Sequence, residues 1–165
     1  MKKNEPMNAN HQFPAIFDEN SEILILGSFP SVASRKINFF YGHPRNRFWQ
    51  VLSSCLDEDL PLDNQGRKQL CLRHHIALYD SIESCLICGS SDSSIKDVVP
   101  ANLSFIYTYA RVKRIIFNGK AAEKWFYQYQ SVPEGVEAIC LPSTSPANAA
   151  YSLEKLVAEW KCFLK

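Results

Sequence analysis

The sequence predicts an α/β fold in which a mostly parallel sheet has helices on both faces. The chain has 165 residues, of which 46% are hydrophobic and 21% are charged, the profile of one globular domain. It contains four short, continuously apolar runs, which are typical of strands buried on both faces. Segments with helical spacing separate these runs, and parallel strands need such crossover connections.

The apolar runs stop at residue types that end strands. The run that begins at Glu22 is followed by Gly27. The run that begins at Arg114 is followed by Asn118 and Gly119, and the run that begins at Ala138 by Pro142. Ligands of parallel sheets bind beyond the carboxyl ends of the strands, so the loops after the four runs are where chemistry is expected. The predicted strands are Glu22–Leu26, Ile76–Tyr79, Arg114–Phe117 and Ala138–Leu141.

Apolar residues recur with helical spacing between and after these runs. The chain has no internal repeat and no convincing linker, so we expect one domain over residues 13–165. A loose N-terminal segment, residues 1–12, is expected to precede it. The predicted helices are Arg47–Leu56, Gly66–His74, Ala101–Ala110, Ala121–Tyr129 and Leu153–Phe163.

The N-terminus and the apolar runs indicate where the protein resides. The first ten residues, MKKNEPMNAN, lack the apolar segment of a secretory signal. The longest apolar stretches are about five residues, whereas roughly 20 are needed to span a bilayer. We therefore expect a cytoplasmic protein without membrane contact.

The six cysteines are expected to be reduced thiols, because a chain without a secretory signal rarely forms a disulfide framework. Only Cys85 and Cys88 are close in sequence. A structural zinc site would need a second pair or two suitably spaced histidines, and the adjacent His74 and His75 are poorly spaced for that purpose. We expect no metal site.

A basic and aromatic segment follows the first predicted strand. The stretch Ile23–Leu56 has no acidic residue and contains four cations, so the remaining chain keeps all 17 acids but only 14 of the 18 Lys and Arg residues. The net charge of the whole chain is only +1. Aromatic residues alternate with these cations. Cations that neutralise phosphates, together with aromatic rings on which bases can stack, are typical of a surface that binds nucleic acid. A solvated loop without a partner is the alternative interpretation.

The loop after the last predicted strand has three adjacent hydroxyl groups. Ser143, Thr144 and Ser145 lie between two prolines, inside the uncharged stretch Ala138–Leu153. Neutral donors on a partly fixed backbone can hold a phosphate at close range. A plain Ser/Pro turn is the alternative interpretation.

Other polar motifs favour structural roles. Asp80 ends a predicted strand and Asp97 lies in a polar loop, where aspartates commonly cap turns and helices, with an active-site acid as the alternative. Asn118-Gly119-Lys120 lacks the upstream glycine and the Ser/Thr of a phosphate-binding loop. No Gly-x-Ser-x-Gly elbow surrounds any serine. Triphosphate binding and serine hydrolysis are therefore disfavoured.

Four segments together resemble the uracil-DNA glycosylase superfamily, and within it the hypoxanthine (deoxyinosine) DNA glycosylase branch. Their order and spacing are more specific than any one of them. The likeness runs from about Glu22 to the C-terminus. The four segments are GSFPS at 27–31, HPRNRFW at 43–49, the Asn118–Gly119 turn and LPSTSPA at 141–147.

The resemblance implies a three-layer α/β/α sandwich with a central four-stranded parallel sheet. It also implies a monofunctional DNA glycosylase, which hydrolyses the N-glycosidic bond of a flipped deaminated base, hypoxanthine in first place, in base excision repair. The implied partner is double-stranded or single-stranded DNA that contains such a base. A monomer that uses no cofactor is expected.

Asn46 is the catalytic residue that the resemblance implies. Other branches have an Asp or Asn just after the glycine of the first motif to position the attacking water, whereas here Gly27 is followed by Ser-Phe-Pro. An amide does not titrate near neutral pH, so Asn46 is expected to hold a water beneath C1′ and not to act as a general base. Asn38 is the second candidate.

The resemblance further implies contacts with the base and with the DNA strand. Phe48 matches the aromatic ring on which the flipped base stacks in related families. The expected base-binding residues are Phe48, Gly27, Ser28, Phe29 and His43. The expected DNA-binding residues are Ser31, Arg45, Arg47, Ser143, Thr144 and Ser145.

Three other functions fit parts of the same pattern. A uracil-directed or mismatch-directed glycosylase of the superfamily would differ in the base it releases. A lesion-binding module without catalysis would bind DNA and leave no abasic sites. A small-nucleotide hydrolase would prefer free nucleosides and show little salt-dependent DNA affinity.

Overall fold

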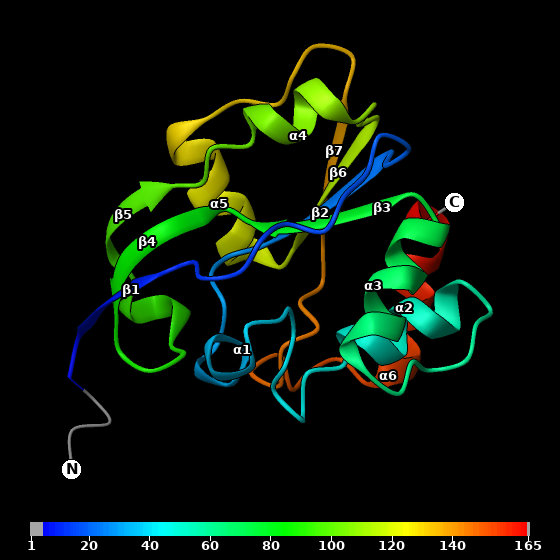
Figure 1. The fold of residues 1–165 in the computed structure, drawn as a ribbon. Helices are drawn as coiled ribbons and strands as arrows, with labels where there is room; N and C mark the ends of the chain where they lie inside the picture. The colour runs from blue at the N-terminus through cyan, green and yellow to red at the C-terminus, as the bar shows by residue number, and fades with distance from the viewer. Residues whose placement is uncertain (1–4, 165) are drawn as a thin grey trace.

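The computed structural model describes residues 5–164 and contains two β-sheets (Figure 1). The larger sheet is parallel, with the strand order β3-β2-β6-β7, and the smaller one is antiparallel, with the order β1-β4-β5. The strands are β1 (Met7–Asn10), β2 (Ile23–Gly27), β3 (Ile76–Asp80), β4 (Ile82–Ile87), β5 (Lys96–Pro100), β6 (Arg114–Asn118) and β7 (Glu137–Leu141). The helices are α1 (Val32–Ile37), α2 (Phe48–Cys55), α3 (Asn64–Arg73), α4 (Ser104–Tyr109), α5 (Lys120–Tyr129) and α6 (Leu153–Trp160), with short 3-10 helices η1 (Asp92–Ser94) and η2 (Lys161–Phe163).

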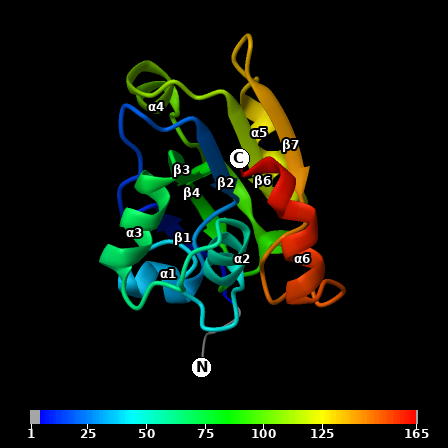
Figure 2. The ribbon, with the colours of Figure 1, turned by 90° about the vertical axis from the view of Figure 1, so that its right-hand side faces the viewer.

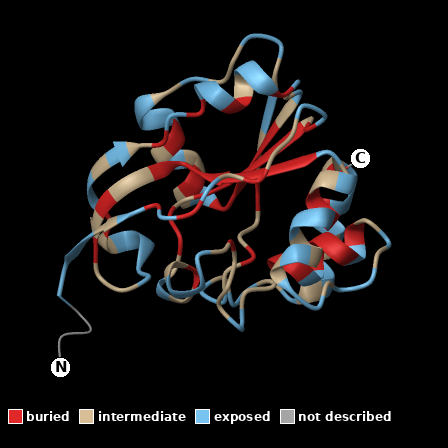
Figure 3. Ribbon diagram, in the orientation of Figure 1, coloured by how far each residue is buried: buried red, intermediate tan, exposed pale blue. Residues whose placement is uncertain are grey.

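The parallel sheet forms from the four apolar runs of the sequence. Every residue of β2 and β3 is buried, because helices cover both faces of these strands (Figure 3). The predicted strands are confirmed, with ends that differ by at most one residue. In the register of the sheet, Gly27 pairs with Asp80 and Asn118 pairs with Leu141. The carboxyl ends of all four strands therefore meet at one edge.

Helices cover both faces of this sheet. Figure 2 shows α2, α3 and α6 on the near side of the four strands, and α5 behind them. The two groups bury apolar side chains against the strands, with Leu156 and Trp160 from α6 on one side and Ala122 and Phe126 from α5 on the other. The predicted α/β/α sandwich around four parallel strands is confirmed.

The antiparallel sheet was not predicted, and it corrects the expectation of a loose N-terminal segment. Residues 7–10 form β1, in which Met7 pairs with Ile87 and Asn10 pairs with Ser84. His11, the next residue, is buried. The sequence MNAN alternates apolar and polar residues over only four positions, and asparagine is disfavoured in strands, so the strand signal is weak. Residues 1–4 of the expected segment lie outside the described residues.

A short helix, α1, follows the first parallel strand and contains Arg35 and Lys36, two of the four cations of the basic segment. Ser31 caps it, because the Ser31 side chain accepts a hydrogen bond from the backbone N–H of Ser34. Asn38 ends it in the left-handed conformation, with φ of 54°. Between residues 5 and 164, no helix combines the length and the apolar character needed to cross a membrane.

Candidate active site

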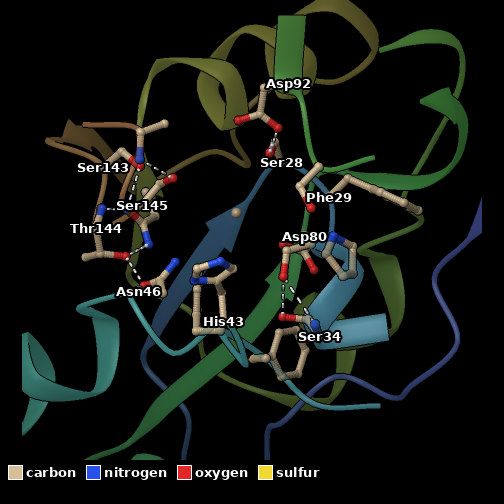
Figure 4. A pocket seen from close by; sticks show the side chains of 18 of the residues that line it. Ser28, Phe29, Ser34, His43, Asn46, Asp80, Asp92, Ser143, Thr144 and Ser145 are labelled. Carbon is tan, nitrogen blue, oxygen red and sulfur yellow. Dashed lines mark hydrogen bonds between the residues drawn. The ribbon is translucent and has the colours of Figure 1, made fainter. Parts of the chain in front are cut away.

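A cavity of about 280 Å³ lies where the parallel strands end (Figure 4). Its walls come from the loop after β2, from the HPRNRFW segment, from the ends of β3 and β6, and from the loop after β7. This volume is at the small end of the range for ligand pockets, which suits one ring system. The cavity brings together nine of the predicted site residues: Gly27, Ser28, Phe29, Ser31, His43, Asn46, Ser143, Thr144 and Ser145.

The last residue of β2 must be a glycine. A Cβ atom on Gly27 would lie 2.4 Å from Oδ1 of Asp80, which is closer than such atoms approach in proteins. The hydroxyls that follow are already bonded within the protein. Ser28 Oγ donates to Asp92 Oδ1 at 2.8 Å, and Ser31 Oγ caps α1. Backbone groups and these fixed hydroxyls therefore form this wall.

Asn46 is held with one side of its amide toward the cavity. Its Oδ1 accepts hydrogen bonds from the backbone N–H of Phe48 and from Thr144 Oγ1, both at 2.9 Å. Thr144 is fully buried and is itself bonded twice to Asn118. The Nδ2 group of Asn46 has no protein partner among residues 5–164. Asn38, the second candidate, is exposed and does not line the cavity.

His43 projects its ring into the cavity beside Asn46 (Figure 4). The backbone N–H of Arg45 donates to His43 Nδ1 at 3.0 Å. In the neutral imidazole the remaining ring nitrogen, Nε2, then carries the hydrogen. His43 thus presents a donor to any group that occupies the cavity.

Phe48 does not line the cavity, and its assignment as the stacking ring is corrected. Its side chain is fully buried in the core, because it points inward from the first turn of α2. One ring of the cavity wall, Tyr41, stacks on it with ring centroids 4.0 Å apart. Burial, together with the nearby Asp80 carboxylate, raises the pKa of Tyr41, so its phenol stays protonated. Phe48 therefore supports a cavity ring and does not itself contact a ligand.

Two DNA-contact assignments are corrected by the hydrogen bonds of the loop after β7. Arg47 donates from Nη2 to the carbonyl oxygens of Ser145 and Asn148, each at 3.0 Å, and from Nη1 to that of Tyr151. Its guanidinium is therefore used inside the protein. Thr144 is buried and is bonded to Asn46, so it is not a surface contact.

The other assigned DNA contacts remain accessible. Ser143 and Ser145 are partly exposed at the cavity, and Arg45 is exposed outside it. Ser143 Oγ accepts a hydrogen bond from the backbone N–H of Ser145 at 3.1 Å, which fixes the turn. These three residues are predicted DNA contacts that stay accessible, and the fourth, Ser31, lines the cavity with its hydroxyl used to cap α1.

Two residues of the site region were missed or undervalued by sequence reasoning. Asp80, interpreted as a cap, lines the cavity with a nearly buried carboxyl group. Its partner is His11, from the segment expected to be loose. An aspartate directly after a fully apolar strand was a usable signal for Asp80. No local signal identifies His11, because its contact joins residues that lie 69 positions apart in the chain.

The fold and the motifs define a class of protein. Residues 14–164 match the family model described as the uracil DNA glycosylase superfamily. This match covers most of the chain, which therefore belongs to that superfamily.

Two curated relatives, both named hypoxanthine DNA glycosylase, are similar over nearly the whole chain. The protein from Methanosarcina barkeri (strain Fusaro / DSM 804) is 37% identical over 150 residues, which cover 90% of this chain and 93% of the relative. The protein from Methanosarcina acetivorans is 34% identical over 155 residues, which cover 93% and 96%. The solution NMR structure of a candidate uracil DNA glycosylase from Methanosarcina acetivorans has a TM-score of 0.81 at 31% identity, covering 96% of this chain and 97% of that one.

Proposed function

We propose that this protein is a monofunctional DNA glycosylase that removes hypoxanthine from DNA in base excision repair. The names of both curated relatives support the substrate. The observation that supports the chemistry is Asn46, an amide fixed by two hydrogen bonds with its Nδ2 group free in a cavity that suits one base.

Base flipping explains why the cavity is small and walled on several sides. The N-glycosidic bond is inaccessible inside the base stack, so the nucleotide must rotate out of the duplex. A deaminated base pairs poorly, and its extrusion therefore requires less energy than that of a normal base. The cavity would receive the base, and the loops at its mouth would hold the strand.

Asn46 acts through its amide nitrogen. Its Oδ1 already accepts two hydrogen bonds inside the protein. The free end of the amide is therefore Nδ2, which can donate to a water beneath C1′ or to the departing base. The sugar develops positive charge as the bond breaks, and the base leaves as an anion. Two donors fixed beforehand, Asn46 Nδ2 and His43 Nε2, stabilise the negative charge of the departing base without reorganisation, and the proton that water loses on adding to C1′ neutralises that base.

The lysines argue for hydrolysis without a lyase step. A bifunctional enzyme needs an amine that attacks C1′ from within the pocket. Lys36 and Lys120, the two lysines beside site loops, are exposed and do not line the cavity. Water is therefore the nucleophile in this proposal.

The first test is base excision from a defined lesion. End-labelled duplexes with one deoxyinosine or one uracil are incubated with the protein and a chelator, then treated with hot alkali. Cleavage at inosine that requires alkali is expected, and Asn46→Ala should reduce the rate by about 10²- to 10³-fold. Cleavage mainly at uracil would change the assigned substrate. Tight DNA binding without cleavage at either lesion would favour a lesion-binding module.

A further inference from the structure

A groove separate from the cavity lies between α1 and β1, the outer strand of the antiparallel sheet (Figure 1). Its volume is about 700 Å³, and no described residue lines both the groove and the cavity. All four residues of β1 line the groove, and α1 contributes Val32, Arg35 and Lys36. The rest of its wall is formed by Glu5, Gln12, Ile87 and Gly89. The groove is thus a second surface, which the proposed excision reaction does not use.

The outer edge of β1 has backbone groups that are free to pair. The backbone N–H of His11 donates to the carbonyl of Glu83, and in an antiparallel pair such bonds recur at every second residue. The N–H and C=O groups of Asn8 and Asn10, which are out of phase with His11, therefore point away from β4. Between residues 5 and 164 these groups have no backbone partner. An extended chain that lies along β1 can pair with them and add a strand to the sheet.

The two edges of the antiparallel sheet differ in how they resist such pairing. β5, at the other edge, has Lys96 and Pro100, and its register with β4 is irregular. Charged residues, prolines and bulges are the features by which edge strands avoid pairing with other chains. Residues 7–10 include none of these features, because the sequence of β1 is MNAN and its register with β4 is regular. β1 is therefore the edge that stays open to another strand.

The wall of the groove combines apolar side chains with positive charge. Met7 is 67% exposed and Val32 is 36% exposed, so both present apolar surface to a ligand. Arg35 and Lys36 contribute two cations, against the single acid Glu5. Neither cation forms an ion pair with another residue of the described chain. A ligand with both apolar and acidic side chains would complement this wall.

Charge and shape decide what can occupy this edge. A second copy of the chain would insert its own β1 between β1 and α1. The two α1 helices, each with Arg35 and Lys36, would then approach one another, and such like-charge contacts are unfavourable. A nucleic-acid strand would need rings on which its bases stack, and none of the described residues that line the groove is aromatic. Neither objection applies to an extended acidic and apolar peptide.

We propose that this groove binds an extended segment of a partner protein in which acidic and apolar side chains alternate. The segment pairs with the outward backbone groups of Asn8 and Asn10, and its carboxylates lie beside Arg35 and Lys36. Its apolar side chains pack against the apolar part of the wall. Because the groove and the cavity share no described residue, such a partner recruits the protein and leaves the cavity open.

The first experiment measures binding of a synthetic peptide of alternating aspartate and valine, long enough to pair with the whole of β1. Fluorescence anisotropy gives its affinity for the full chain, and amide hydrogen exchange followed by NMR locates the pairing. The peptide should slow the exchange of the Asn8 and Asn10 amides, which point outward in the free protein. A peptide with lysine in place of aspartate should bind about 10-fold more weakly, because it meets like charges.

Two variants test the pairing and the charge separately. Asn8→Pro removes an outward N–H and no bond to β4, so the protein should fold while its affinity for the aspartate peptide falls by about 10-fold. Lys36→Glu should weaken the aspartate peptide to a similar extent, about 10-fold, and strengthen the lysine peptide. Lys68→Glu, at an exposed position of α3 outside the groove, is the matched control. If Asn8→Pro does not fold, Lys36→Glu and the exchange data decide the matter.

The contrary outcomes are distinct. Equal affinity for the two peptides, or wild-type affinity in Asn8→Pro and Lys36→Glu, would overturn the proposal. A dimer that forms without peptide and is lost in Asn8→Pro would assign the edge to a second copy. Protection of the Asn8 and Asn10 amides by a single-stranded oligonucleotide, and not by the peptide, would assign it to nucleic acid. None of these measurements depends on base excision, so the proposed function and this interaction can fail independently.

Discussion

At the residue scale, the proposed catalytic amide depends on a buried side chain, that of Thr144. Thr144 donates to Asn46 Oδ1, and Asn118 donates to Thr144 Oγ1 and accepts from the Thr144 backbone. This series of hydrogen bonds fixes which end of the Asn46 amide faces the cavity. A terminal amide torsion is otherwise broad, so an unsupported Asn46 would turn freely.

Thr144→Val tests this network, since valine has nearly the same shape but no hydroxyl. We expect the excision rate to fall by about 10- to 100-fold, because Asn46 loses the partner that holds its orientation. Stability should fall by about 1–3 kcal/mol, since Asn118 is left with an unpaired buried donor. Single-turnover kinetics and thermal unfolding measure the two effects. Thr108→Val, at an exposed position of α4, is the control, and a wild-type rate in Thr144→Val would contradict the network.

At the scale of elements, one arginine joins α2 to the loop after β7. The guanidinium of Arg47, at the start of α2, donates to carbonyl oxygens of that loop. Arg45, two residues earlier, is exposed and free of such bonds among the described residues. The two arginines of this motif therefore have different roles. Arg47 holds the loop after β7, and Arg45 is available to bind a phosphate.

The two arginines should respond differently to salt. Arg45→Ala should weaken DNA binding about equally for all sequences and reduce the slope of log affinity against log salt by about one, as expected for one lost phosphate contact. Arg47→Ala should lower the unfolding midpoint and the excision rate, because the loop loses its charged donors, and leave that slope unchanged. Binding titrations at several salt concentrations measure the slopes. Equal slopes for both variants would contradict this division.

At the scale of the whole molecule, the two sheets are joined by the N-terminal segment. β1 pairs with β4 in the antiparallel sheet, and His11 then reaches the end of β3 in the parallel one. Removing the segment would leave Asp80 buried without its partner. Such unpaired buried charges destabilise proteins by about 3–5 kcal/mol.

A chain that begins at residue 13 tests this connection. We expect its unfolding midpoint to fall by roughly 10 °C relative to the full chain, because it loses both the strand pairing and the His11–Asp80 contact. Adding Asp80→Asn to the shortened chain should restore part of the loss, since it removes the unpaired charge. An unchanged midpoint in the shortened chain would mean that the segment contributes nothing to the fold.

Much of the architecture could be predicted because it is encoded locally. Each parallel strand is a continuous apolar run, and its two buried faces demand that pattern wherever the strand pairs. The four motif segments were identifiable for the same reason, since each is contiguous. β1, β4 and β5 were missed. β1 and β5 are short, exposed or partly exposed edge strands that need no apolar run, and β4 mixes buried with partly buried residues and polar with apolar ones.

The sequence indicated which loops surround the site, but it did not indicate which side chains of those loops point into the cavity. Asn46, His43 and the Ser143–Ser145 turn line the cavity as expected. Phe48 does not, because its position in the first turn of α2 directs the ring into the core, and a motif match does not specify that direction.

The sequence by itself determined the fold class, the superfamily and the loops that surround the cavity, because apolar runs, glycines and prolines act on their immediate neighbours. Only the tertiary structure decided which amide end of Asn46 is free, that Arg47 bonds inward, and that His11 meets Asp80. Those outcomes depend on contacts between residues distant in the chain, and a buried polar group takes whichever partner the packed fold brings within hydrogen-bond distance.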